Sequence, residues 1–274
     1  MIHNLKKLID LIWTIWCLIS GSILILLNLP ILLTFVVIFR NKKNNALDYY
    51  IRFTSACILF LWGIRMNCIQ GLEIDNKKNY VFISNHRSYL DLFIAIISIK
   101  QYKKFLGKEE VFKWPIIGIL ARELGHVSVK RESPKDREKS YLTLLDILRN
   151  GSSIFLCPEG AVEMNDKLIN EMRNGAFRMA IESNTPIVAI TIVNAGELFP
   201  PDKIRIRPGK CINYISVPFE TKHLSLNDVD TLREKVKKEI FDNLIRHYPN
   251  GKYPIEFDPE NFKETFYSTA QKSK

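Results

Sequence analysis

The sequence lacks the short signatures of several large protein classes. It contains neither a G-x-x-x-x-G-K loop nor a G-x-G-x-x-G loop, which argues against a nucleotide-fuelled enzyme. It has no helix-turn-helix, zinc-finger or RNA-binding signature, so we expect no nucleic-acid partner. Its 5 cysteines are scattered and have no C-x-x-C spacing, which is typical of buried thiols in a reducing compartment. We therefore expect no disulfide framework, no metal site and no bound cofactor.

Acidic residues are outnumbered by basic ones. The 274 residues include 39 Lys+Arg and 29 Asp+Glu, giving a formal net charge of +10. A basic excess of this size favours an anionic partner, such as a membrane surface or a phosphorylated substrate. The length fits one large domain with an appendage.

Charge is absent from a long segment near the N-terminus. Residues Leu11 to Phe39, about 29 positions, carry no charged side chain, and roughly 20 apolar residues suffice to cross a bilayer. Asn28-Leu29-Pro30 interrupts the run, because proline breaks or kinks a helix. Basic residues flank both ends, which is expected if both ends stay on the cytoplasmic side. A hairpin dipping into one leaflet, a single kinked span and a buried core helix are the three alternatives.

A second apolar stretch, Ala56 to Ile64, is too short to span a bilayer. We expect it to lie in the membrane interface or to pack on the domain. Residues 1–66 are therefore predicted to form N-terminal membrane-anchoring helices, and the domain that follows is predicted to lie on the cytoplasmic side of the membrane.

Beyond Asn67 the pattern alternates between short apolar strands and amphipathic helices. The predicted strands are Tyr80–Ser84, Lys103–Leu106, His126–Val129, Ile154–Cys157 and Ile187–Val193. The predicted helices start near Leu90, Pro115, Pro134, Ile169 and Val229. This alternation predicts an α/β domain over residues 67–248, with a mostly parallel or mixed sheet flanked by helices. Residues 249–274 are predicted to be a turn-rich C-terminal tail.

The most informative motif runs from Asn85 to Asp91. It follows the strand at Tyr80–Ser84 and precedes a helix, so His86 lies in a strand-to-helix turn, where ligands and catalytic groups collect in α/β sheets. His86 could act as a general base that Asp91 orients. Alternatively, Ser88 to Asp91 forms a capping box, in which Asp91 only satisfies a backbone donor of the first turn.

Further motifs accompany it in a fixed order. They are Lys108-Glu109 with Pro115, Gly118 and Gly125 to Arg131; Phe155 to Gly160, followed by Arg173 to Phe177; and Pro186 to Val188. Together with Asn85 to Asp91 they resemble the motif blocks of the glycerolipid acyltransferases, the family that includes the lysophosphatidate acyltransferases. The resemblance covers roughly residues 70 to 220 and implies that family's α/β fold with an N-terminal hydrophobic anchor.

The resemblance implies roles for particular residues. His86 would be the base and Asp91 its orienter, while Glu159 and Gly160 would help to bind the acceptor. Lys108 and Arg131 would hold the acceptor phosphate. Where the family has Thr-Arg after Pro-Glu-Gly, this chain has Ala161-Val162, and Arg173 could supply the missing charge.

Two further chemical roles remain open. Asn85 and the backbone amides that open the helix after Ser88 are candidate oxyanion donors, with ordinary turn hydrogen bonding as the alternative. Cys157 invites an acyl-cysteine mechanism, whereas a buried strand cysteine is the simpler interpretation.

The resemblance implies a membrane-associated O-acyltransferase. It would move a fatty acyl chain from acyl-CoA or acyl-carrier protein to the hydroxyl of 1-acyl-glycerol-3-phosphate, making phosphatidate at an anionic membrane surface. One alternative is an enzyme of the same fold for another lysophospholipid headgroup, which Val162 keeps open. The other is a non-catalytic, basic lipid-binding membrane protein.

Overall fold

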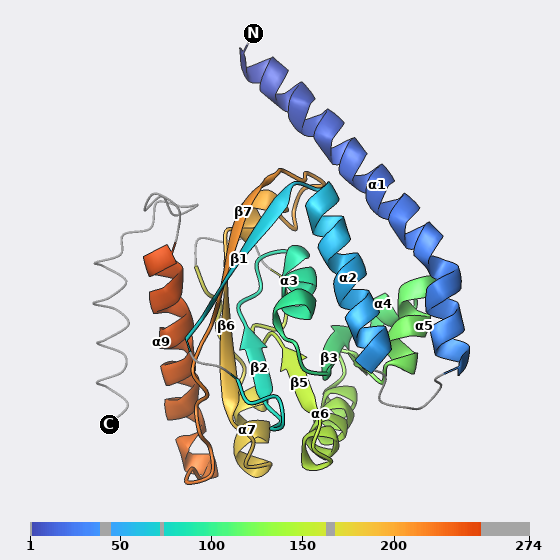
Figure 1. The fold of residues 1–274 in the computed structure, drawn as a ribbon. Helices are drawn as coiled ribbons and strands as arrows, with labels where there is room; N and C mark the ends of the chain where they lie inside the picture. The colour runs from blue at the N-terminus through green and yellow to red at the C-terminus, as the bar shows by residue number, and fades with distance from the viewer. Residues whose placement is uncertain (1, 39–44, 72–73, 163–167, 248–274) are drawn as a thin grey trace.

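The computed structural model describes residues 2–38, 45–71, 74–162 and 168–247. Helices and strands alternate along most of this length (Figure 1). The strands are β1 (Ile64–Gln70), β2 (Val81–Ser84), β3 (Lys103–Lys108), β4 (Val127–Val129), β5 (Ser153–Leu156), β6 (Ile187–Val193) and β7 (Gly209–Ile215). The helices are α1 (Ile2–Ile38), α2 (Asn45–Leu61), α3 (Leu90–Ser98), α4 (Glu109–Phe112), α5 (Pro115–Glu123), α6 (Pro134–Arg149), α7 (Gly175–Glu182), α8 (Ala195–Leu198) and α9 (Val229–His247).

The strands form one mixed sheet of 7 strands in the order β1-β7-β6-β2-β5-β3-β4. All neighbouring strands are parallel except β6 and β7, which pair antiparallel. Strands β2 and β5 lie side by side in the middle of the sheet, and both run in the same direction. Their C-terminal ends therefore meet at one edge, and both the His86 turn and the Pro158-Glu159-Gly160 turn begin there.

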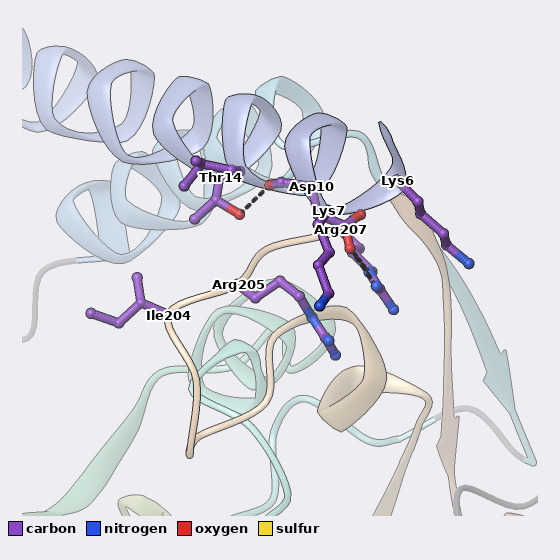
Figure 2. Close-up of a pocket in the computed structure, with 8 residues that line it drawn as sticks. Lys6, Lys7, Asp10, Thr14, Ile204, Arg205 and Arg207 are labelled. Atoms are coloured by element: carbon purple, nitrogen blue, oxygen red, sulfur yellow. Dashed lines mark hydrogen bonds and ion pairs between the residues drawn. The ribbon is translucent and has the colours of Figure 1, made fainter. Parts of the chain in front are cut away.

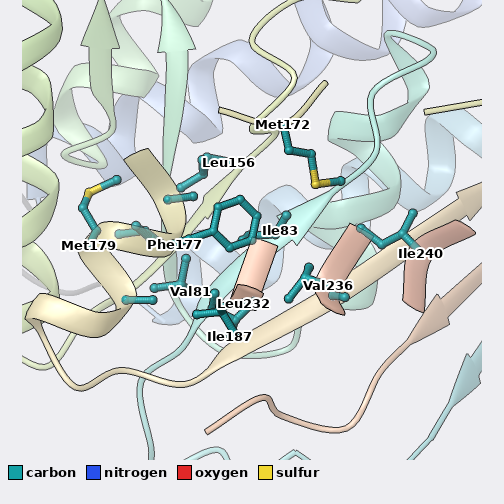
Figure 3. Close-up of a cluster of buried hydrophobic side chains, with 14 of the residues drawn as sticks. Val81, Ile83, Leu156, Met172, Phe177, Met179, Ile187, Leu232, Val236 and Ile240 are labelled. Carbon is teal, nitrogen blue, oxygen red and sulfur yellow. The ribbon is translucent and has the colours of Figure 1, made fainter. Parts of the chain in front are cut away.

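Successive side chains of the central strands point to opposite faces of the sheet and pack into two separate hydrophobic cores. Val81 and Ile83 of β2 face a cluster built with α6, α7 and α9, in which Phe177 is fully buried (Figure 3). Tyr80 and Phe82 face the opposite cluster, built with α1, α2, α3 and α8. The sheet is thus covered on both faces, which explains why its central strands read as continuous apolar runs.

The predicted α/β class and five predicted strands are confirmed. The helix expected from Ile169 to Ser183 is shorter, because α7 begins only at Gly175. Strands β1 and β7 were not predicted. Only Ile64 of β1 is buried, and burial alternates along β7, so neither strand shows the apolar run that marks the central strands.

The N-terminal segment forms one helix that continues through Pro30. Of the two effects expected from Pro30, a break or a kink, the break is therefore absent from the described residues. The Asn28 side chain donates to the Leu24 carbonyl at 2.6 Å and also meets the Tyr50 hydroxyl of α2, so the neighbouring helix supports the turn that contains proline. Residues Asn4 to Phe35 are long and apolar enough to cross a membrane.

Helix α2 and strand β1 contain the second apolar stretch. Ile58, Leu59, Trp62 and Ile64 are buried in the core beside α3, so this stretch packs on the domain, as one of the two expectations had it. The boundary drawn between residues 66 and 67 falls inside β1. The predicted tail, residues 249–274, lies outside the described residues.

A capping prediction follows from α6. The Ser133 side chain accepts a hydrogen bond from the Asp136 backbone N–H, and Pro134 occupies the first helical turn. Replacing Ser133 with Ala should lower the free energy of unfolding by about 1 kcal/mol, because the first turn loses its acceptor. Urea unfolding in detergent, followed by circular dichroism, measures the change. Ser133→Asp should restore most of it, and equal stability of the Ala variant and the wild type would contradict the assignment.

Candidate active site

His86 lies in the turn between β2 and α3, two residues beyond Ser84, the last residue of the strand. Its backbone N–H donates to Glu159 Oε1 at 2.8 Å, which ties this turn to the one that follows β5. The His86 side chain is 22% exposed, whereas Asp91 is 1% exposed. One edge of the imidazole is thus buried against a carboxylate while the rest of the ring stays accessible.

Asp91 holds this turn through a single oxygen. Its Oδ2 accepts from His86 Nδ1 at 2.9 Å and from the backbone N–H groups of Arg87 at 2.8 Å and Ser88 at 2.9 Å. The two sequence interpretations of Asp91 therefore describe the same atom, which both closes the turn and contacts the imidazole. Asp91 Oδ1 is buried and has no hydrogen-bond partner among the described residues.

This contact assigns the proton on the imidazole. A carboxylate is an acceptor only, so Nδ1 must carry the hydrogen that it donates to Asp91. The lone pair of the neutral ring then resides on Nε2, on the side away from the buried carboxylate. A ring fixed in this tautomer can accept a proton from a hydroxyl placed beside Nε2.

Glu159 lies behind the His86 turn. Its Oε1 accepts from His86 N–H, and its Oε2 accepts from the Asn170 N–H at 3.1 Å. The residue is 7% exposed, and burial raises the pKa of its carboxyl to about 7. Both oxygens accept from backbone N–H groups, so Glu159 holds two turns together, and its role in binding the acceptor stays a prediction.

Asn85 is directed into the sheet. Its side-chain amide donates to the Ile192 carbonyl at 2.9 Å and accepts from the Ile192 N–H at 2.8 Å, and the residue is fully buried. The N–H groups of Arg87 and Ser88 are engaged by Asp91, and that of Leu90 by Ser88 Oγ. These donors are thus engaged within the protein, as the alternative of ordinary hydrogen bonding has it, and donation to an oxyanion stays a prediction.

Two arginines gather next to the turn after β5. The Arg173 backbone N–H donates to the Pro158 carbonyl at 3.0 Å. Gly160 has a φ of +83°, and a Cβ there would lie 3.1 Å from Arg173 Cζ, so the guanidinium covers this glycine. The pKa of Arg131 is lowered by burial and then by the charge of Arg173. Neither guanidinium forms an ion pair with another described residue, which leaves a compact positive region beside the turn.

Lys108 belongs to the same edge of the sheet. It ends β3, where it pairs with Val129 of β4, two residues before Arg131. Its amino group lies 3.3 Å from Glu110, and its side chain is 45% exposed. Lys108 is thus partly neutralised, and the arginine pair carries most of the unbalanced charge.

Cys157 lies among the same groups. Burial raises the pKa of its thiol well above the ordinary value, and the charges of Asp91 and Glu159 raise it further. A thiol held in its protonated form is a poor nucleophile, so the environment disfavours the acyl-cysteine alternative. Among the described residues, His, Cys, Asp and Glu side chains form no group of three or more that could hold a metal ion.

Sequence reasoning missed two supports of the His86 turn. Ser88 Oγ donates to the Phe199 carbonyl at 2.6 Å, and the rings of Tyr89 and Phe199 lie 5.7 Å apart. Asn170 supplies the second N–H for Glu159 from the segment before α7. These contacts join residues 11 and 111 positions apart, and no local pattern in the sequence signals them.

The sequence matches one protein-family model and several curated acyltransferases. Residues 66–193 match the family model described as "Acyltransferase". The chain is 29% identical to a chloroplastic 1-acyl-sn-glycerol-3-phosphate acyltransferase of Brassica napus, over 68% of this chain and 54% of that protein. A chloroplastic 1-acyl-sn-glycerol-3-phosphate acyltransferase of Arabidopsis thaliana is 31% identical over 48% of this chain and 37% of that protein. The chain thus spans about half or less of the length of these curated relatives.

The fold also matches a solved structure. The crystal structure of the 1-acyl-sn-glycerophosphate acyltransferase from Thermotoga maritima superposes with a TM-score of 0.75, covering 88% of this chain and 97% of that one. The sequence identity is 18%, so this likeness establishes the shared architecture, a mixed sheet flanked by helices.

The buried Glu159 carboxyl predicts a pH-dependent stability. Its folded pKa of about 7 exceeds the ordinary value of 4.5, so the folded chain keeps a proton that the unfolded chain releases between these values. The free energy of unfolding should therefore fall as the pH rises from about 4.5 to 7, by about 3 kcal/mol at most. Glu159→Gln should remove this slope, although it also loses one backbone contact at every pH. Denaturant titrations at pH 5 and pH 8 measure the slope.

Exposed Glu138 on α6 provides the matched control. Glu138→Gln should leave the slope unchanged. A Glu159→Gln variant with the wild-type pH dependence would show that burial of this carboxyl does not control it.

Proposed function

We propose that the protein is a membrane-associated O-acyltransferase of phospholipid synthesis, and the match of residues 66–193 to the acyltransferase family model supports this proposal. It transfers a fatty acyl chain from acyl-CoA or acyl-carrier protein to the free hydroxyl of 1-acyl-glycerol-3-phosphate, and the product is phosphatidate. The observation that carries the proposal is the His86–Asp91 pair, with Nδ1 held 2.9 Å from a buried carboxylate.

In the proposed mechanism His86 Nε2 accepts the proton of the acceptor hydroxyl. The hydroxyl oxygen attacks the thioester carbonyl carbon, a C–O bond forms, and the C–S bond breaks as the tetrahedral intermediate collapses. The leaving thiolate takes the proton from His86, which restores the neutral ring. Asp91 stabilises the imidazolium that exists between the two proton transfers.

Glu159 has the role of a positioning residue in this scheme. Through His86 N–H it fixes the backbone that carries the base, and through Asn170 N–H it anchors the segment leading to Arg173. One side chain thereby sets the base and the positive region in relation to each other. This link supports a single site in which an anionic group and a reacting hydroxyl of one acceptor bind together.

The positive region supports a phosphate-bearing acceptor. Guanidinium groups bind phosphate oxygens bidentately, and Arg131 and Arg173 lie together beside Gly160 without an ion-pair partner among the described residues. We propose that they supply the charge that Val162 does not. Lysophosphatidate is the preferred acceptor on this argument, and a lysophospholipid with another headgroup is the second candidate because Val162 lies in the same turn.

The placement of α1 supports a helix that lies against the domain instead of crossing the bilayer. Contacts with the domain or with α2 occur at Asp10, Thr14, Cys17 and Asn28, a stretch of about 27 Å along the helix axis. A helix that spans the bilayer cannot pack on a water-facing domain over this length. We propose that the outward apolar face of α1 enters one leaflet and that the domain stays on the cytoplasmic side.

The base assignment predicts the effects of two substitutions. His86→Ala should lower turnover about 100-fold or more while the fold is retained, because a base of this kind supplies about 10²–10⁴-fold in rate. Asp91→Asn should also lose most activity but keep its stability, since an amide oxygen at the Oδ2 position can still accept all three N–H groups. Steady-state rates with lysophosphatidate and acyl-CoA, compared with thermal unfolding, separate the two properties.

Asp91→Ala is the matched control, because it removes the acceptor altogether and should lose both stability and activity. A folded His86→Ala enzyme with activity within a few-fold of the wild type would refute the base. A fully active Asp91→Asn enzyme would reduce Asp91 to a cap.

The phosphate assignment predicts a selective change in KM. Arg131→Ala should raise the KM for lysophosphatidate far more than the KM for the acyl donor, whereas Lys135→Ala, an exposed cation on α6, should change neither. Val162→Arg should be tolerated or should improve the use of lysophosphatidate. Mass spectrometry of products from a panel of lysolipids tests the acceptor directly. Preference for a choline, ethanolamine or glycerol headgroup would overturn the acceptor while leaving the His86 chemistry in place.

A further inference from the structure

A cationic pocket lies between the first turns of α1 and the loop that leads into β7. Its volume is about 380 Å³, and it is lined by Lys6, Lys7, Asp10, Leu11, Thr14, Ile204, Arg205 and Arg207 (Figure 2). None of these residues belongs to the His86 turn or to the arginine pair beside Gly160. We propose that this pocket binds the phosphate group of an anionic phospholipid in the bilayer, as a site separate from that of the reacting lipid.

The walls of the pocket are held by specific contacts. Thr14 Oγ1 accepts from the Ile206 N–H at 3.1 Å and donates to the Asp10 carbonyl at 2.7 Å. Arg207 Nε donates to Asp10 Oδ2 at 2.9 Å, and this bond lowers the pKa of the Asp10 carboxyl. The loop and the helix therefore keep a fixed relation, so the cavity is part of the folded structure.

The charge in the pocket is unbalanced. Asp10 is the single carboxylate in the lining, and Arg207 already pairs with it. Lys6, Lys7 and Arg205 form no ion pair with another described residue, and Arg205 Nε is buried without a hydrogen-bond partner among them. Figure 2 shows the side chains of Lys7 and Arg205 extending into the same space between helix and loop. An anion there would relieve the repulsion between these cations and satisfy the buried donor.

The surroundings identify the source of the anion. Leu11 and Ile204 line the pocket and are 55% and 79% exposed, and Leu8 and Ile12 continue the apolar face of α1 at 51% and 59%. Positive groups set directly beside exposed apolar side chains match the headgroup level of a bilayer, where phosphates lie next to acyl chains. A soluble phosphate compound would gain nothing from this apolar rim. The inference thus rests on the proposed membrane placement of α1, but not on the acyl-transfer reaction.

The tryptophans of the protein allow a direct binding test. Trp13 and Trp16 lie on α1, close in sequence to Thr14 of the pocket. Full-length protein in neutral detergent micelles is titrated with phosphatidylglycerol that carries a dansyl group on an acyl chain, without acyl donor, and energy transfer from tryptophan is recorded. Dansyl phosphatidylcholine, which has no net charge, is the reference lipid. We expect apparent affinity about tenfold higher for the anionic lipid.

Two pairs of substitutions isolate the pocket. In the double variant Lys7→Gln with Arg205→Gln, the affinities for the anionic and the neutral lipid should differ by no more than about twofold. The double variant Lys135→Gln with Lys139→Gln on α6 removes the same charge elsewhere and should keep the tenfold difference. Lys7→Arg with Arg205→Lys should also keep it, which guards against a folding defect. Asp10, Thr14 and Arg207 remain in all of these variants, so the docking of α1 is preserved.

Four outcomes overturn the proposal. The first is equal affinity of the wild type for the two lipids. The second and third concern the double variants: the pocket variant and the α6 variant lose the preference for the anionic lipid equally, or the pocket variant keeps it in full. The fourth is displacement of the lipid by micromolar adenosine 3′,5′-bisphosphate. The last result would assign the pocket to a soluble phosphate compound. Transfer activity is assayed separately on the same variants, so a missing lipid preference in an active enzyme refutes the pocket alone, and lipid preference in a protein that transfers no acyl group refutes the proposed reaction alone.

Discussion

Two buried carboxylates hold the turn that carries His86, and the arrangement of the candidate site depends on them. Asp91 closes the turn through the N–H groups of Arg87 and Ser88, while Glu159 binds the N–H of His86 from the other side. Burying a carboxylate is costly unless hydrogen bonds offset the loss of water. Backbone donors offset part of this cost, although burial still raises the pKa of the Glu159 carboxyl to about 7, and no lysine or arginine pairs with either carboxylate among the described ion pairs. Asp91 Oδ2 therefore stays directed at the imidazole, and hydrogen bonds hold the His86 turn from both sides.

The same two contacts explain how distant motifs act together. Glu159 follows β5 and His86 follows β2, and these strands are parallel neighbours, so their C-terminal ends meet. Asn170 then brings the segment before α7 to Glu159, and Arg173 follows three residues later over Gly160. The base and the guanidinium groups are thus joined by short covalent and hydrogen-bonded paths. Small shifts of Glu159 should move both, which is why a positioning residue here matters to substrate alignment as well as stability.

The sequence could predict the local parts of this arrangement but not the long-range ones. The central strands were predictable because they are buried on both faces, and the His86–Asp91 pair because both residues lie in one turn. Strands β1 and β7 were missed because β1 is mostly exposed and only alternate residues of β7 are buried. Ile169 and Met172 are buried, so the segment before α7 looked helical, although it has no regular secondary structure where Asn170 reaches Glu159. Asn85 directly follows β2, and its two hydrogen bonds with Ile192, 107 positions away, have no local signal in the sequence.

One short loop couples this turn to the N-terminal helix. Its first residue, Phe199, accepts from Ser88 Oγ, and its ring lies 5.7 Å from Tyr89 and 6.3 Å from Trp62. Trp62 in turn donates to the Cys17 carbonyl of α1 at 2.8 Å. At its other end the loop binds α1 again through Ile206 and Arg207. Because α1 is connected to both ends of this loop, it fixes the height of His86, meaning its distance from any membrane surface that α1 enters. Because a lysophospholipid keeps its acyl chain in the leaflet, this height decides whether its hydroxyl reaches Nε2, and the contacts of α1 are therefore part of the catalytic geometry proposed for this protein.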